Sequence, residues 1–415
     1  MERGLKRDPA FNERPMVAAA AGLGAGIAVA RYMQGTYAFI ALCLLFIMAS
    51  SAFFLKRRML TVFIGATALG FLRVLPYLLA EPARALGDST VFALANAKLN
   101  ISSFFEELSQ TLLARCDALF KEASPLVRAI LLGDTTMLSF FDNEAFRAAG
   151  VSHILALSGL NASIFAQILA LFIPKRRPGV RFALIAAFLF VYCALAAFPA
   201  SLLRACVMAL CIHAAPLFGR KNDPLSSLAL AFVFIVLPLP FWMFSAGFIL
   251  SFSATAGVVM LYAPLCEKLA KLPEPLAADV SVTLSATLST LPFTLQLFGR
   301  LPLYSLVSNL LIVPLVTLSM PLSLAALLLS FVWFPLGEIA AFPARLLADA
   351  SDYLSKAFAS LPYSVLSIEK PSPAAGVLFL AALVFLSKFC LLENKKRYPI
   401  AFALLASSAL CLIFL

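Results

Sequence analysis

The feature that most constrains this chain is a series of uncharged apolar stretches, each about 18 or more residues long, that recurs along the sequence. A helix rises 1.5 Å per residue, so about 20 residues cross a hydrocarbon core that is about 30 Å thick. Backbone groups in lipid must be hydrogen-bonded internally, and the sequence lacks the alternating segments typical of a barrel. We therefore predict an all-α fold, a polytopic integral membrane bundle of about 11–12 helices.

Composition supports this class and excludes a soluble globular domain. Hydrophobic residues make up 62% of the chain and charged residues 13%, against about 45–50% and 25% in soluble domains. The eight cysteines show no metal-binding or disulfide spacing, and the two histidines, His153 and His213, are too few for a zinc site of the multi-histidine kind. We expect no metal and no cofactor.

The net charge of +11 is concentrated in short segments between the apolar stretches. These basic segments are Arg3 to Arg14, Lys56 to Arg58, Lys175 to Arg181, Arg220 with Lys221, Lys268 with Lys271, and Lys395 to Arg397. A nucleic-acid interface is one interpretation, but the positive-inside rule accounts for the pattern more simply. We predict a multi-pass protein of the cytoplasmic membrane with its N-terminus in the cytoplasm.

Four regions are predicted along the chain. They are a three-helix membrane region at 1–80, an extracytoplasmic amphipathic helical segment at 81–127, a membrane core at 128–335, and an interfacial helix with two further membrane helices at 336–415. Ser103 and Glu106 form a capping-box pattern at the start of an amphipathic helix. Two shorter helices are expected to start near Pro125 and Ser139 and to end near Gly133 and Gly150.

The uncharged stretch 301–336 is too long for one crossing and too short for two. Because proline interrupts helices, we predict a proline-broken hairpin of two short helices that enters the membrane and returns, and we regard it as a candidate pore element. Its prolines are Pro302, Pro314, Pro321 and Pro335. Residues 338–361 are predicted to form an interfacial amphipathic helix, with residues such as Ile339 and Phe342 on its apolar face.

The segment 150–161 carries several polar residues at the start of a predicted span, 151–173. On one continuous helix, His153, Ser158, Asn161 and Gln167 would share about half of the circumference. Gly159 would allow close helix approach. Two interpretations stay open: a water-lined face, or hydrogen bonds between helices.

Four further polar residues are candidates for a path through the membrane. Arg204 lies near the outer end of a predicted span, where a cation either serves function or reaches the headgroups. Gln296, Arg300 and Asn309 flank the turn into the predicted hairpin. Arg300 lies on the side where positive charge is disfavoured, so it either guides an anion or contacts phospholipid headgroups.

Several ordered motifs resemble the competence domain of the ComEC family of DNA-uptake proteins. They begin with Arg128 to Asp134, Glu144 to Gly150 and Ser152 to Leu160. Similar blocks follow at Leu203 to Met208 with Gly219 and Arg220, at Ala246 to Phe252, at Thr290 to Pro292 with Phe298 and Gly299, and at Asn309 to Pro314. The resemblance covers residues 120–335 in the order of the family.

This resemblance implies passage of single-stranded DNA across the cytoplasmic membrane during natural transformation. It also implies contact with membrane lipid, an extracytoplasmic DNA receptor, and a cytoplasmic DNA translocase or nuclease as partners. A homo-oligomer is compatible with the resemblance. The family usually has histidine where this chain has Asn161, so a hydrogen-bonding role is expected there. The large soluble parts of many members are missing from this sequence, and we expect no nuclease or other enzyme activity.

Two other functions fit the same residues. Broken helices and intramembrane polar groups also serve secondary transporters of small solutes. An intramembrane serine hydrolase would use Ser158 as nucleophile with His153 or His213 as base. On a continuous helix, however, Ser158 and His153 would be poorly placed for a direct hydrogen bond.

Overall fold

The computed structural model describes residues 14–32, 58–79, 103–157, 159–174, 176–368, 373–387 and 394–414. These residues are mainly helical, which confirms the predicted all-α class. Two short strands, β1 (Arg300–Pro302) and β2 (Val365–Ser367), pair antiparallel with Leu301 opposite Leu366. Residues 33–57, in the middle of the predicted three-helix region, and Ser158 lie outside the described residues.

The helices follow one another along the chain, joined mostly by short connections. In chain order they are α1 (Pro15–Tyr32), α3 (Arg58–Leu79), α6 (Ser103–Phe120), α7 (Ser124–Leu132), α8 (Phe140–Ala148), α9 (Gly159–Phe172), α10 (Pro178–Leu195), α11 (Ala200–Ala214), α12 (Pro224–Val236), α13 (Ala246–Lys268), α14 (Glu274–Phe298), α15 (Ser305–Val332), α16 (Phe334–Ala359), α17 (Pro373–Leu386) and α18 (Asn394–Phe414). Short 3-10 turns lie at Lys121–Ala123, Ser152–Ile154, Ala215–Phe218 and Pro240–Phe244.

Five helical segments in the described residues are long and apolar enough to cross a membrane. They are α10, α11 together with its 3-10 extension, α13, α14 and α15. Shorter apolar helices, including α9, α12 and α17, accompany them. The chain is therefore a polytopic membrane protein; which side its N-terminus faces stays a prediction.

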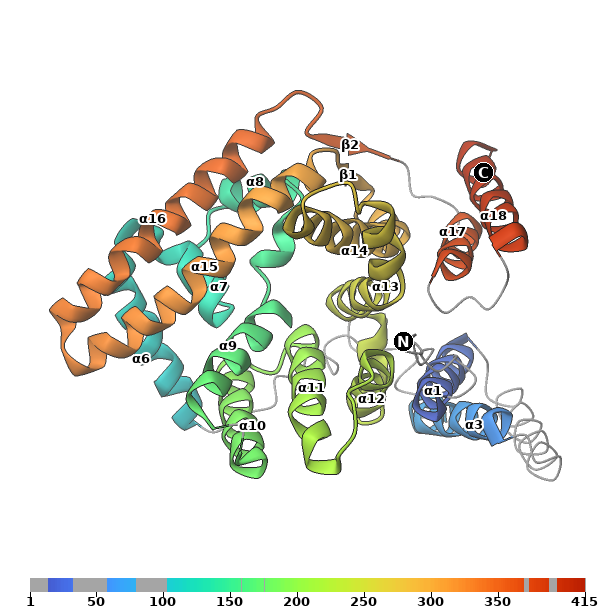
Figure 1. Ribbon diagram of the computed structural model, residues 1–415, viewed down its shortest axis with the longest axis horizontal. Helices are drawn as coiled ribbons and strands as arrows, with labels where there is room; N and C mark the ends of the chain where they lie inside the picture. Colours follow the sequence, from blue (N-terminus) through green and yellow to red (C-terminus); the bar gives the residue numbers. More distant parts are fainter. Residues whose placement is uncertain are drawn as a thin grey trace, which may run out of the picture.

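Consecutive helices from α10 to α14 pack against one another (Figure 1). Arg14 forms an ion pair with Asp223 of the α11–α12 connection (2.9 Å). The Lys268 ammonium, at the end of α13, lies 5.2 Å from the ring centroid of Tyr398 in α18. That the basic connections share one side of the membrane stays a prediction.

The prediction of a proline-broken hairpin at 301–336 is wrong. Pro314 and Pro321 lie inside α15, a continuous 28-residue helix, and Pro335 occupies the first turn of α16. A proline inside a helix removes one backbone donor, and in membrane helices neighbouring elements re-satisfy the freed groups. Here α16 packs antiparallel along α15, and β1 and β2 close the open end of this pair (Figure 1).

The α15–α16 pair is held by a seam of mostly small side chains. Buried positions recur at alternating intervals of three and four residues, the spacing of an antiparallel coiled coil. In α15 they include Ile312, Val316, Ser319, Ser323, Ala326 and Ser330; in α16 they are Gly337, Ala341, Ala344, Ala348, Ser351 and Ser355. Such residues let backbones approach closely, and a Cβ on Gly337 would lie 2.5 Å from the Cβ of Ser330.

The opposite face of α16 carries the apolar residues of the predicted interfacial helix. Ile339, Phe342, Leu346 and Tyr353 are 62–72% exposed. The helix prediction for this segment is confirmed within a few residues at either end. Its placement at a membrane interface stays a prediction.

Candidate functional site

The segment between α8 and α9 is the first part of the site. Gly150 adopts a left-handed conformation (φ +76°), residues 152–154 form a 3-10 turn, and α9 begins only at Gly159. The prediction of one helix over 151–173 is therefore wrong, and His153 does not share a helix with Asn161 and Gln167. The periodicity missed this because distant side chains hold the backbone of the segment in its irregular shape.

Hydroxyl and amide groups from other helices bind the carbonyls at both ends of this segment. Ser308 Oγ donates to the carbonyl of Ala149, and Asn309 Nδ2 lies 3.5 Å from that of Gly150. Ser201 Oγ donates to the carbonyl of Leu157 at 2.8 Å. The last carbonyls of a helix have no partner within the helix, so the contacts from Ser308 and Asn309 fix the end of α8 to α15.

The end of α7 is satisfied in the same way. Asn161 Nδ2 donates to the carbonyl of Ile130 (2.8 Å), and the hydroxyl of Tyr192 donates to that of Leu131 (3.1 Å). Gly133, at φ +76°, ends the helix in the left-handed conformation that glycine tolerates. Of the two interpretations of Asn161, the structure favours a hydrogen bond between helices.

A charged cluster that the sequence motifs did not reveal lies beside this helix end. Arg128 is buried at 8% exposure, and its Nη1 donates to both carboxylate oxygens of Asp117 (3.1 and 2.9 Å). Its Nε donates to Asp134 (3.0 Å), which also accepts from the backbone and hydroxyl of Thr136. The spacing of Arg128 and Asp134 around Gly133 was the sequence pattern that could have predicted their ion pair. No sequence pattern indicated that Asp117 would join them.

The charge state of Asp134 follows from these contacts. Burial alone would raise the pKa of its carboxyl, but the hydrogen bonds from Thr136 and Arg128 together hold that pKa below its ordinary value. Asp134 is therefore ionised at neutral pH and pairs with the Arg128 guanidinium. Its role is to fix the 133–139 connection against α6 and α7.

Arg204 forms the second part of the site. It lies on α11 and is 8% exposed. Its Nε donates to Ser251 Oγ (2.8 Å) and its Nη1 to Thr255 Oγ1, while Met208 Sδ lies 3.8 Å from Nη1. Ser251 and Thr255 are one turn apart on α13, so their hydroxyls face the guanidinium together.

The Arg204 guanidinium also covers the start of α9. A Cβ on Gly159 would lie 2.5 Å from Nη2, so a side chain at this position would displace the guanidinium. None of the ion pairs within the described ranges involves Arg204. Its charge thus lies at the junction of α9, α11 and α13 with only neutral partners.

The remaining predicted residues do not converge on this junction. His153, Gln167 and Gln296 are exposed. Arg300 is 55% exposed in β1 and forms an ion pair with Glu144 of α8. Ser158 lies outside the described residues, and the hydrolase alternative stays a prediction.

In the described part of the chain, no group of three or more His, Cys, Asp or Glu side chains is arranged to hold a metal ion. Two buried cysteines, Cys193 of α10 and Cys206 of α11, lie with their sulfurs 3.2 Å apart. They are reduced thiols that pack α10 onto α11.

Comparison with known proteins decides the family. The model of the competence protein family matches residues 130–393, which is more than half of the chain. The chain belongs to the competence protein family. The ComEC resemblance predicted over residues 120–335 is thereby confirmed, and the family match extends beyond the predicted limit at residue 335.

One relative of this competence protein is ComE operon protein 3 of Bacillus subtilis (strain 168). The two are 26% identical over 274 residues, which is 64% of this chain and 34% of the relative. The competence protein thus matches about a third of the length of this relative. No solved structure matches the chain.

Proposed function

We propose that this competence protein is the membrane component through which single-stranded DNA enters the cytoplasm during natural transformation. Membership of the family and the set of apolar helices support this role. The observation on which the proposal rests is Arg204, a buried guanidinium without a carboxylate partner in the described residues.

A buried cation is costly unless an anion compensates it. Cations within membrane segments are rare and by default point to a transport path or another function. Arg204 has hydroxyl partners from α13, which orient the guanidinium but leave its charge in place. A phosphate of passing DNA would supply the missing anion, because arginine and phosphate form strong, charge-assisted hydrogen bonds.

The non-helical backbone next to Arg204 supports the same location. Irregular backbone at membrane depth is tolerated where it is buried in protein or lines a watery cavity. Residues 151–157 lie between the end of α8 and Gly159, and Leu157 is bonded to Ser201 at the start of α11. We place the DNA path beside this segment, with Arg204 as its phosphate contact.

Arg300 has a different role from the one expected from the sequence. Its ion pair with Glu144 fixes β1 to α8, so we assign it a structural contribution first and a contribution to DNA entry second. We propose that the N-terminus lies in the cytoplasm, which the basic segments of the sequence support through the positive-inside rule. A DNA receptor outside and a translocase or nuclease inside complete the proposed pathway.

The test is DNA entry in cells that carry Arg204→Gln or Arg204→Lys. Loss of one phosphate contact in the path should lower entry of labelled DNA into the nuclease-protected pool about tenfold or more, the equivalent of about 1.4 kcal/mol. Arg204→Lys should keep most of the entry because it keeps the charge. Surface-bound DNA and the amount of protein in the membrane should stay unchanged.

Two controls separate a phosphate contact from a packing contact. Arg147→Gln removes an exposed cation of α8 (64% exposed) and should leave entry unchanged. The double variant Ser251→Ala and Thr255→Ala removes the hydroxyl partners but keeps the cation, so it should reduce entry less than Arg204→Gln does. Normal entry with Arg204→Gln, or equal loss in Arg204→Lys and Arg204→Gln, would contradict the proposal.

A further inference from the structure

A cavity of about 70 Å³ lies between α13 and α14 on one side and α17 and α18 on the other. Leu261 and Leu265 of α13, Leu288 of α14, and Leu383 and Leu386 of α17 supply its apolar walls. The pocket lies farther along α13 than Ser251 and Thr255, and it serves no role in the proposed DNA path.

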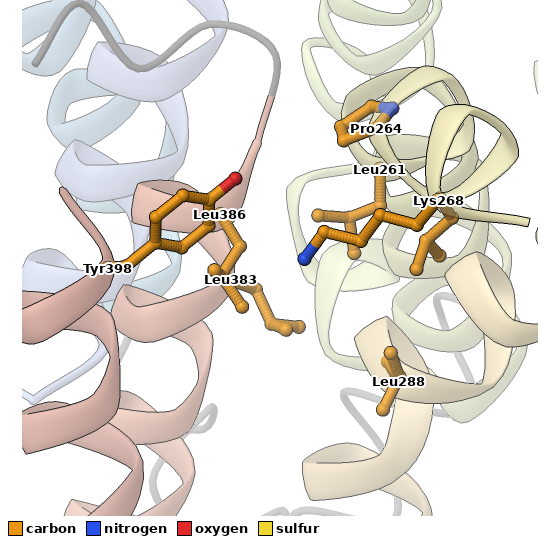
Figure 2. Close-up of a pocket in the computed structure, with 8 residues that line it drawn as sticks. Leu261, Pro264, Lys268, Leu288, Leu383, Leu386 and Tyr398 are labelled. Carbon is orange, nitrogen blue, oxygen red and sulfur yellow. The ribbon is translucent and has the colours of Figure 1, made fainter. Parts of the chain in front are cut away.

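The polar groups of this pocket lie at one end of it. Lys268, in the last turn of α13, and Tyr398 of α18 line the pocket, with the ammonium 5.2 Å from the ring centroid. Figure 2 shows the Lys268 side chain reaching from α13 across the gap toward Tyr398. The apolar wall then continues along α13 from Leu265 to Leu261, about 10 Å below Lys268 at the rise of a helix.

The pocket has polar groups at one end and apolar walls behind them, which is the order of headgroup and acyl chain in one membrane leaflet. The polar end coincides with the end of α13, and the apolar part lies farther back along that helix, between the helices. A cation and a phenol at the interface above an apolar wall match a phospholipid, with its headgroup phosphate at Lys268 and an acyl chain below.

We propose that this pocket binds an anionic phospholipid that joins α17 and α18 to the α13–α14 pair. The ammonium of Lys268, which lines the pocket, supports an anionic headgroup. Basic pockets between membrane helices recognise anionic headgroups in this way. An acyl chain also suits the aliphatic lining better than a polar segment of a second copy would, because unpaired polar groups are costly in such a wall.

The test is retention of lipid by the full chain, purified from vesicles with equal amounts of phosphatidylglycerol and phosphatidylcholine. Native mass spectrometry counts the lipids that remain after exchange into detergent. The wild type should retain phosphatidylglycerol about fivefold over phosphatidylcholine, since one cation near the surface contributes about 1 kcal/mol. Lys268→Gln should bring that ratio close to one.

Two variants make the test specific to the pocket. Lys271→Gln removes an exposed lysine that does not line the pocket and should keep the wild-type ratio. Leu265→Trp fills the apolar wall without touching the charge and should reduce the number of retained lipids of both kinds. If Lys268→Gln is not recovered in folded form, Leu265→Trp carries the test alone.

Several results would overturn the proposal: equal retention of the two lipids by the wild type, an unchanged ratio in Lys268→Gln, or unchanged lipid number in Leu265→Trp. A dimer in the mass spectra without bound lipid would assign the pocket to a second copy instead. The readout is lipid retention, so its outcome is independent of DNA entry.

Discussion

The contact between α13 and α14 gives a sharp test of the fold, because α13 also presents Ser251 and Thr255 to Arg204. Gly257 of α13 is buried against α14. A Cβ at this position would lie 2.5 Å from the carbonyl oxygen of Ser285 and from the Cβ of Ser289, and would collide with Ser289 Oγ. Gly247, on the same helix, has no atom within 4 Å of its Cβ position.

The two glycines therefore predict opposite effects of alanine. Real Cβ contacts stay above 3.0 Å, so Gly257→Ala must move the two backbones apart by about 0.5 Å. A gap of about that size forfeits a quarter or more of each contact energy across the interface, and overpacking costs about 1–3 kcal/mol. The higher helix propensity of alanine offsets about 1 kcal/mol of this loss in folding stability. We expect Gly257→Ala to lose about 1–2 kcal/mol and Gly247→Ala to gain up to about 1 kcal/mol.

The measurement is thermal unfolding of the purified variants in one detergent, followed by cysteine-reactive fluorescence or by loss of the monodisperse peak. Gly257→Ala should melt at least about 2 °C below the wild type and Gly247→Ala at or above it. Adding Ser289→Gly to Gly257→Ala removes one of the colliding side chains and should restore part of the loss. Equal melting temperatures for the two alanine variants would refute the close packing of α13 on α14.

Two further predictions concern the end of α7. Asn161→Leu leaves the buried carbonyl of Ile130 without its donor and should cost about 1–3 kcal/mol in thermal unfolding, whereas Asn161→His should keep most stability because an imidazole N–H can donate there. The carboxyl of Asp134 has a lowered pKa in the fold, so its contribution is full at neutral pH and is lost as the pH falls below its ordinary value of 3.8. Melting temperature should therefore fall less steeply between pH 7 and pH 3 in Asp134→Asn than in the wild type; parallel slopes would contradict the assigned charge cluster.

Local signals predicted the short helices well. Ser103 begins α6, and Ser139 caps α8 by accepting a hydrogen bond from the backbone of Asp142. Gly133 ends α7 and Gly150 follows α8, each in the left-handed conformation that glycine favours. These signals act within one turn of the chain, so the sequence alone contains them.

Contacts between distant residues decided the features that the sequence did not predict. The irregular segment after α8 depends on Ser308 and Asn309, more than 150 positions away. The prolines of α15 are accommodated because α16 packs along it, which no local rule for proline contains. Of the candidate site residues, Arg204 was identified for its charge, but its partners Ser251 and Thr255 follow only from the packing of α11 on α13.

The polar side chains of the membrane core divide into two groups by what they bind. Asn161, Tyr192, Ser201 and Ser308 each donate to a backbone carbonyl near a helix end. In an apolar surrounding such carbonyls must be satisfied, so these side chains are needed for the fold whether or not water enters.

Arg204 differs because it binds hydroxyls that could be satisfied by their own helix; Thr255 Oγ1 already donates to the carbonyl of Ser251 (2.9 Å). Replacing the guanidinium with a neutral group would leave no helix end uncapped, and the fold would be relieved of a buried charge. A cation that the fold does not require is best explained by an anion that the described chain does not contain. DNA phosphate is that anion if Arg204→Gln reduces DNA entry while stability in detergent stays at or above the wild-type value; a loss of stability would instead assign Arg204 to packing.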